Sequence, residues 1–302
     1  MKGFGTSPNK QRTENETDHS KEEKISKAVK YHLKGNLNEA KKLYQELLDM
    51  SYFDPKVLIN YGVISQQLGE IDLAIRLYEK SIILFPKRSE AYLNLGNIYN
   101  DSGQYNEAEG LYRKTINLSP KNDMDFTNLG SLLIHLKKLD EATIYIRKAI
   151  KLNPKNALAY LNFGSILKFE GRIEEAKQAT QKSIELNPSY HLSHSNLGSI
   201  LIELGDLEAA EINIRKAINI HPGFSEAHYS LGNLLVETRR IDEAISCYKK
   251  AISLNRDYKL AISGLGKALM LQGNTMEGLN KVRESEGYIL FDANISSVQF
   301  IS

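Results

Sequence analysis

The sequence predicts an all-α protein, an α-solenoid in which pairs of helices repeat every 34 residues. The first observation is that four residue types recur at this interval in one phase, as a repeat array requires. The second is that apolar residues within each repeat are spaced like one face of a helix. The four series are a glycine in the first helix (Gly62, Gly96, Gly130, Gly164, Gly198, Gly232, Gly266), an alanine in the second (Ala40, Ala74, Ala108, Ala142, Ala176, Ala210, Ala244), an isoleucine near its end (Ile82, Ile116, Ile150, Ile184, Ile218, Ile252) and a proline beyond it (Pro86, Pro120, Pro154, Pro188, Pro222).

Residues 89–122 show how one repeat is built. Tyr92, Leu95 and Tyr99 lie at i, i+3 and i+7, which predicts the buried face of a first helix. Gly103 ends this helix, because glycine reaches the left-handed conformation of a helix C-terminus without steric cost. The second helix ends before the recurring proline, which cannot continue a helix. One pair cannot cover its own apolar face, so adjacent repeats must pack on each other.

The predicted elements follow in order along the chain. Residues 1–20 are polar and charged, and we expect a disordered leader there, with a docking segment as the alternative. A solenoid domain is expected over 21–292, and its first and last repeats are degraded, as terminal repeats tend to be. The eight repeats are 21–54, 55–88, 89–122, 123–156, 157–190, 191–224, 225–258 and 259–292.

Two departures from the repeat have structural consequences. Lys137 and Arg239 replace turn glycines, which costs about 1 kcal/mol each if the left-handed conformation is kept. The end of the chain, 287–302, has strand-like runs at 288–291 and 297–301. We expect a C-terminal tail over 293–302 and a hairpin that seals the last repeat, with the start of a further domain as the alternative.

Composition bounds the function. The 302 residues carry 39 Lys and Arg against 37 Asp and Glu, a net charge of +2, which gives no general attraction to nucleic acid or an anionic membrane. No apolar run approaches the ~20 residues that span a bilayer, and the N-terminus lacks the apolar core of a secretory signal. Cys247 is the only cysteine, so an internal disulfide or a cysteine zinc cluster is excluded. We expect a cytoplasmic monomer without a cofactor or metal.

The registers resemble those of the tetratricopeptide repeat (TPR) family, with small residues at repeat positions 8 and 20 and proline at position 32. The resemblance covers 21 to about 286 without an insertion and implies a right-handed superhelix whose first helices line an inner groove. The Asn-Leu-Gly motif at 94–96, 128–130 and 196–198 looks most like the repeat arrays of O-linked N-acetylglucosamine transferases. Those enzymes carry a large α/β catalytic domain after their repeats, and we expect no room for one before Ser302.

Position 6 of the first helix carries an asparagine in five successive repeats, which we call the asparagine ladder. Position 6 lies away from the buried positions 4, 7, 8 and 11, and asparagine is disfavoured inside helices by roughly 0.5 kcal/mol. An amide has donors and an acceptor, so a ladder of amides can hold an extended peptide backbone. The resemblance implies the same role. The alternative is that these residues bond neighbouring loops or water. The ladder consists of Asn60, Asn94, Asn128, Asn162 and Asn196.

Other residues share the predicted groove face. The ladder lapses at Ser230 and Gly264, so we expect the groove to weaken toward the C-terminus. Apolar side chains at positions 2 and 13 suit a peptide with apolar residues, although those at position 2 could instead pack on a neighbouring helix. The expected groove residues besides the ladder are Asn97, Asp101, Met124, Leu158, Phe169, Leu192 and Asn233, next to Ser131 and His135.

The sequence offers no convincing catalytic residues. His194 and His228 occupy a core position that is tyrosine in other repeats, so we expect packing rather than metal binding. Residues 264–268 resemble a phosphate loop but lack its leading glycine and its Ser/Thr. Basic pairs end several second helices, and i,i+4 pairs such as Glu109–Arg113 are expected to neutralise them.

The sequence therefore predicts a non-catalytic scaffold that binds an extended segment of another protein in its groove. The alternative is the substrate-recruiting arm of a glycosyltransferase-like or other transferase whose catalytic part lies on another chain or is missing. A third reading is a self-assembling structural solenoid. The partner's identity does not follow from the repeat pattern, because repeat arrays serve many unrelated tasks.

Overall fold

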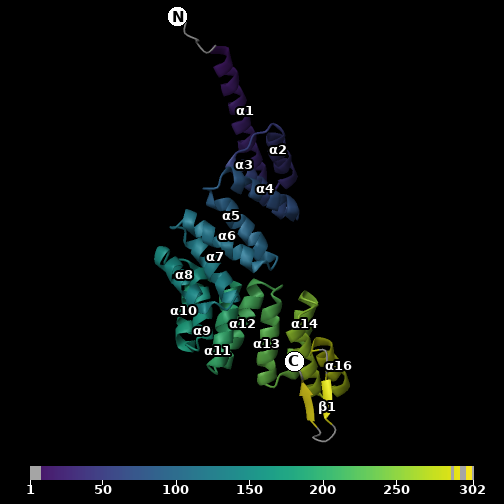
Figure 1. Ribbon diagram of the computed structural model, residues 1–302. Coiled ribbons are helices and arrows are strands. Elements are labelled where there is room, and N and C mark those ends of the chain that lie inside the picture. The colour runs from purple at the N-terminus through teal and green to yellow at the C-terminus, as the bar shows by residue number, and fades with distance from the viewer. Residues whose placement is uncertain (1–7, 287–288, 293–296, 301–302) are drawn as a thin grey trace, which may run out of the picture. The chain divides into compact units, whose positions relative to one another are not determined.

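The computed structural model describes residues 8–286, 289–292 and 297–300, with side chains described for 20–285. The chain forms two compact units, Met1–Lys138 and Leu139–Ser302. The first contains helices α1–α7, and the second contains α8–α16 with strands β1 and β2 (Figure 1). Within these described residues the fold is an all-α array of helical hairpins, as predicted.

The helices alternate between two classes. The first helices of the pairs are α1 Pro8–Leu33, α3 Pro55–Gln67, α5 Ser89–Asp101, α7 Asp123–His135, α9 Ala157–Phe169, α11 His191–Glu203, α13 Ser225–Glu237 and α15 Lys259–Gln272. The second helices are α2 Leu37–Asp49, α4 Ile71–Leu84, α6 Tyr105–Leu118, α8 Leu139–Leu152, α10 Ile173–Leu186, α12 Leu207–Ile220, α14 Ile241–Leu254 and α16 Thr275–Glu286. From α3 and α2 onward, the helices of each class begin 34 residues apart. The boundary between the units falls between α7 and α8, inside the expected repeat 123–156, so one continuous array across it stays a prediction.

Local sequence explains where helices start and stop. Asp54 caps α3, its side chain accepting from the backbone N–H of Lys56 at 2.8 Å, and Pro55 occupies the first turn, where no N–H is needed. Between the helices of a pair the chain turns through a left-handed residue, usually glycine. Lys137 and Arg239 keep this conformation, with φ of 59° and 62°, so the strain expected from the sequence is present.

The recurring glycine of the first helix permits close helix contact. A Cβ on Gly232 would lie 2.7 Å from Cε1 of Tyr248, and one on Gly266 would lie 2.7 Å from the carbonyl oxygen of Gly278. Both distances are below those that real Cβ atoms show. The small residue at this position of the first helix thus lets paired helices touch.

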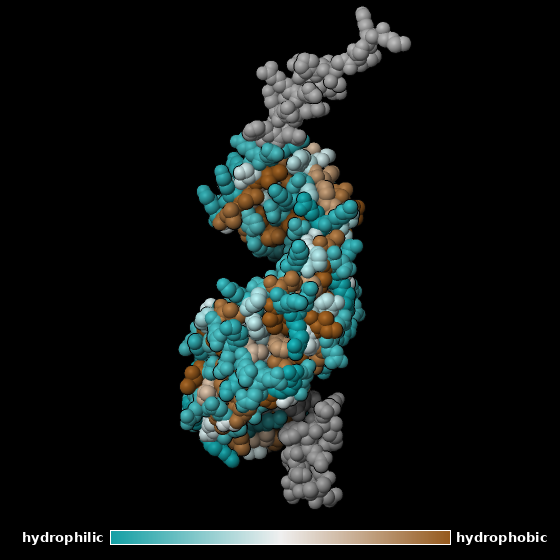
Figure 2. Space-filling view, turned by 90° about the vertical axis from the view of Figure 1, so that its left-hand side faces the viewer, coloured by the Kyte–Doolittle hydropathy of each residue, from teal (hydrophilic) through white to brown (hydrophobic). Residues whose placement is uncertain are grey.

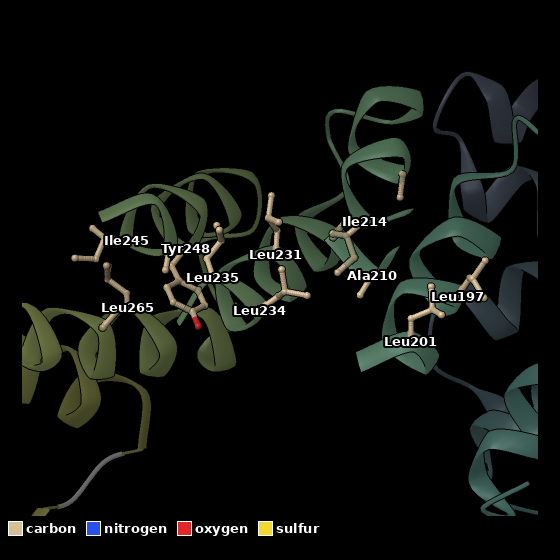
Figure 3. Close-up of a cluster of buried hydrophobic side chains, with 14 of the residues drawn as sticks. Leu197, Leu201, Ala210, Ile214, Leu231, Leu234, Leu235, Ile245, Tyr248 and Leu265 are labelled. Carbon is tan, nitrogen blue, oxygen red and sulfur yellow. The ribbon is translucent and has the colours of Figure 1, made fainter. Parts of the chain in front are cut away.

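The core of the second unit runs through successive pairs rather than around one centre. Leu231 and Leu235 of α13, Ile245 and Tyr248 of α14 and Leu265 of α15 belong to one cluster of buried side chains (Figure 3). Each pair contacts the next, as in repeat proteins generally.

Buried Asp125 interrupts the apolar pattern of the first unit. Its residue is 1 % exposed, at a position that is alanine in most other repeats, such as Ala91. Neither carboxylate oxygen makes a hydrogen bond of normal geometry within the described part of the chain. Burial raises the pKa of Asp125 to about 6; the nearby Asn122 side chain opposes this, and Asp123 and Glu90 add to it.

The ends of the chain differ in part from expectation. Helix α1 starts at Pro8, where the sequence analysis expected disorder through residue 20; residues 1–7 lie outside the described residues. The reason is that Pro8 suits a first helical turn and neither proline nor glycine follows it before Leu33. At the other end, β1 Ile289–Asp292 and β2 Ser297–Phe300 pair antiparallel, which fits the strand-like runs. The intervening 293–296 lie outside the described residues, and sealing of the last repeat stays a prediction.

Ion pairs join neighbouring repeats on the second helices. Glu109 accepts from Arg113, four residues on, at 2.7 Å and from Lys138 of the next turn at 2.8 Å. Glu211 binds Arg215 at 2.7 Å and Arg240 at 2.8 Å in the same way. The i,i+4 pairs expected from the sequence are therefore present, and they neutralise part of the basic pairs.

Candidate functional site

A polar cavity of about 390 Å³ opens in the first unit on the predicted groove face. Helices α5, α6 and α7 form it. It brings together three residues expected from the sequence, Asn97, Asp101 and Asn128, with the neighbouring Ser131 and His135. The lining consists of Asn97, Asn100, Asp101, Tyr105, Tyr112, Asn128, Ser131, Leu132 and His135.

Hydrogen bonds and ring contacts position the lining. The hydroxyl of Tyr112 donates to Oδ1 of Asn97 at 2.8 Å. Nδ2 of Asn100 donates to Oδ1 of the exposed Asp101 at 3.4 Å. The rings of Tyr105 and His135 lie 4.4 Å apart at 54°. Carboxylate, amide and hydroxyl groups thus share one cavity with an aromatic face.

Two of the three ladder asparagines in the first unit, Asn60 and Asn94, have partners within the protein. Nδ2 of Asn60 donates to the hydroxyl of Tyr44 at 3.3 Å. Burial raises the pKa of the Tyr78 hydroxyl, and a hydrogen bond with Asn94 opposes this rise. Both tyrosines belong to the second helix of the preceding repeat. These amides therefore bond side chains on the second helix of the preceding repeat, whereas the alternative interpretation names loops or water as their partners.

The ladder residues of the second unit differ from each other. Nδ2 of Asn196 donates to Oγ1 of Thr180 at 3.3 Å and to Oγ of Ser165 at 3.4 Å. Asn162 is 8 % exposed, and its buried Nδ2 has no hydrogen-bond partner in the described part of the chain. The cause is visible in the sequence, because Ile146 stands where Thr180 stands in the next repeat.

The apolar residues expected in the groove are exposed to different degrees. Phe169 is 69 % exposed and Met124 44 % exposed, whereas Leu158 and Leu192 are half-buried. None of the four lines the polar cavity of the first unit. On the face drawn in Figure 2, hydrophobic residues occur in groups among hydrophilic ones.

A second cavity, of about 280 Å³, lies on the groove face of the second unit. It includes Asn233, which accepts from the hydroxyl of Tyr248 at 2.7 Å. Gly264, where the ladder lapses, is part of its lining, along with Leu260 and Lys267. A Cβ on Gly264 would lie 2.7 Å from Cε1 of Tyr248. Glycine in place of the ladder asparagine at position 264 thus leaves a recess beside the ring of Tyr248. The sequence pattern did not predict this recess.

The histidines singled out in the sequence pack against backbone. His194 is buried, and its Nε2 lies 3.0 Å from the carbonyl oxygen of Pro188. Nε2 of His228 makes the same contact with Pro222 at 3.1 Å, as the hydroxyl of Tyr92 does with Pro86. The packing interpretation is confirmed for His194, whereas His228 makes the same backbone contact but is only half-buried.

Other site classes find no support where the structure is described. Residues 264–268 lie inside helix α15 and not in a loop. Among described residues no group of three or more His, Cys, Asp or Glu is placed to hold a metal ion. No helix in that part of the chain combines the length and apolarity that crossing a membrane requires.

The sequence analysis missed several cavity residues. Tyr105, Tyr112, Asn100 and Leu132 line the polar cavity, but they are not among the residues expected on the groove face. Two of them, Tyr105 and Tyr112, could have been found as the tyrosines of the second helix of this repeat. That helix begins directly after the turn at Gly103.

Comparisons with known proteins agree with this architecture. Residues 50–263 match a family model described as the cilia and flagella-associated protein 70 C-terminal domain, of the tetratricopeptide-repeat class. A search of curated proteins found no match to the sequence.

Solved structures share the fold at low identity. The APC/C hetero-tetramer Cut9–Hcn1 matches with a TM-score of 0.72 and 16 % identity over 80 % of this chain, which spans about half (48 %) of that chain. A tetratricopeptide repeat protein of Parabacteroides merdae matches with a TM-score of 0.69 and 20 % identity over 83 % of this chain and 99 % of its own. Yeast Tom70 matches with a TM-score of 0.57 and 20 % identity over 83 % of this chain and 55 % of its own.

Proposed function

Because the chain belongs to the tetratricopeptide-repeat family of the cilia and flagella-associated protein 70 C-terminal domain, we propose that it is a non-catalytic scaffold. It binds an extended segment of another protein along the exposed face of its first helices. Proteins with these repeats generally mediate protein–protein interactions.

The observation that supports this proposal is the polar cavity of the first unit. Three residues chosen from the repeat pattern, Asn97, Asp101 and Asn128, line one recess of about 390 Å³. Amide groups can donate to peptide carbonyls and accept from peptide N–H groups, so they hold a backbone without reading its side chains. Selectivity then comes from other groups of the same cavity, such as the carboxylate of Asp101.

The test replaces Asn97, Asn100 and Asn128, the three asparagines that line the cavity, together with alanine and compares captured proteins with those of the unmodified chain. The expected result is loss of the captured partners while helicity by circular dichroism is kept. A matched control replaces Asn117, Asn219 and Asn280, three exposed asparagines of second helices, and should leave capture unchanged. Identical partners for all three chains would contradict the proposal.

The second candidate function is a substrate-recruiting arm for a transferase, and the Asn-Leu-Gly motif of residues 94–96 supports it. The same groove would then deliver substrates to a catalytic part on another chain. A reading frame for an α/β transferase adjacent to this one would favour the arm. Its absence would leave the scaffold as the better description.

A further inference from the structure

The polar cavity of the first unit carries negative charge without a balancing cation in its lining. Asp101 is exposed, and the described contact to its carboxylate is the long 3.4 Å bond from Asn100. No lysine or arginine is among the lining residues. A carboxylate at a recess of this kind attracts a cationic group of a bound segment.

Further oxygen acceptors line the same cavity as this carboxylate. The lining also contributes the amides of Asn97 and Asn128 and the hydroxyl of Ser131. A guanidinium group has five N–H donors spread over a planar fork, whereas an ammonium concentrates its donors at one point. Acceptors distributed around a cavity therefore suit arginine better than lysine.

An aromatic face completes the cavity. Tyr105 and His135 are in ring contact at 4.4 Å and line it from the start of α6 and the end of α7. Guanidinium planes stack on tyrosine rings, and this gains free energy beyond the charge pairing.

We infer that this cavity binds an arginine side chain of the partner segment, with Asp101 as its counter-ion and Tyr105 as its stacking surface. The inference rests on the proposed function, because it assigns a residue type to the segment that the groove binds.

The test titrates the full-length chain with three blocked, fluorescein-labelled nonapeptides of Gly, Ser and Asn that carry arginine, lysine or citrulline at the centre. Citrulline keeps the shape of arginine and lacks its charge. Fluorescence anisotropy at pH 8 and low salt is expected to show about tenfold tighter binding of the arginine peptide than of the citrulline peptide. Lysine should fall between them.

Two variants locate the effect. Asp101→Asn should remove the difference between arginine and citrulline, and Tyr105→Leu should remove the preference for arginine over lysine. Asp257→Asn, the same charge change at an exposed turn residue of the second unit, serves as the control and should change nothing.

Several outcomes would overturn the inference. They are equal binding of arginine and citrulline, an arginine preference that persists in Asp101→Asn, and equal binding of lysine and arginine to the unmodified chain. If the triple asparagine variant still loses its natural partners while the three peptides bind equally, the inference fails and the proposed function stands. If the triple variant keeps its partners, the proposed function fails independently of the peptide result.

Discussion

Replacing Asp125 with alanine is expected to stabilise the protein at neutral pH. The carboxylate is buried, has no hydrogen bond of normal geometry in the described structure, and occupies a position where most repeats carry alanine. In the unfolded chain water solvates this charge, whereas in the folded chain it is buried, so the charge lowers the free energy of unfolding.

The magnitude follows from the pKa. Burial raises the pKa of Asp125 from 3.8 to about 6. At 1.36 kcal/mol per pKa unit, this corresponds to a cost of about 3 kcal/mol above pH 6. The net gain from Asp125→Ala is therefore about 3 kcal/mol at pH 7.5.

The sign of the pH dependence is fixed by the direction of the shift. Between pH 4 and pH 6 the native state binds the proton and the unfolded state does not, so stability from this group falls as pH rises. Lowering the pH from 7.5 to 4.5 protonates the native carboxyl and removes most of the cost. The advantage of the alanine variant should shrink by about 2 kcal/mol over that range.

Urea unfolding followed by circular dichroism measures this, since the chain has no tryptophan for fluorescence. Asp125→Asn serves as a second variant, because it removes the charge at nearly constant size and should also abolish the pH dependence. An alanine variant no more stable than the unmodified chain at pH 7.5, or a difference independent of pH, would refute the reasoning.

Two further predictions concern glycine positions. Gly266→Ala should lower the free energy of unfolding by about 1–3 kcal/mol, because its Cβ would meet the backbone carbonyl of Gly278 at 2.7 Å. Gly110→Ala in α6 has nothing within 4 Å of its Cβ and should be neutral or stabilising in the same urea titration. Lys137→Gly should raise the urea midpoint by the equivalent of about 0.5–1 kcal/mol, since it relieves the left-handed φ of 59°; a lowered midpoint would show that the Lys137 side chain stabilises the fold.

The repeat geometry could be predicted from the sequence because it depends on local and periodic signals. Glycine at a turn, such as Gly103, indicates a left-handed backbone conformation. Glycine within a helix, such as Gly232, indicates a close contact with another helix. The helix starts then follow at intervals of 34 residues. The same signals do not predict helix α1 over 8–20, because its low hydrophobicity indicates disorder although no proline or glycine after Pro8 interrupts the helix.

The site was only partly predictable, because side-chain partners depend on contacts between repeats. The ladder appeared uniform, yet Asn60 bonds Tyr44 while Asn162 faces a repeat in which isoleucine replaces the partner. The orphaned carboxylate of Asp125 was equally hidden, as an acidic residue in a first turn ordinarily faces solvent.

The most direct test of the proposed binding face is site-specific photo-crosslinking to the captured partner. Benzoylphenylalanine is placed at Ser131, in the polar cavity, or at Gly110, an exposed position of α6 outside its lining. A partner that binds along the first helices is expected to crosslink from position 131 and not from position 110. Crosslinks from position 110 alone would contradict the assignment of the binding face.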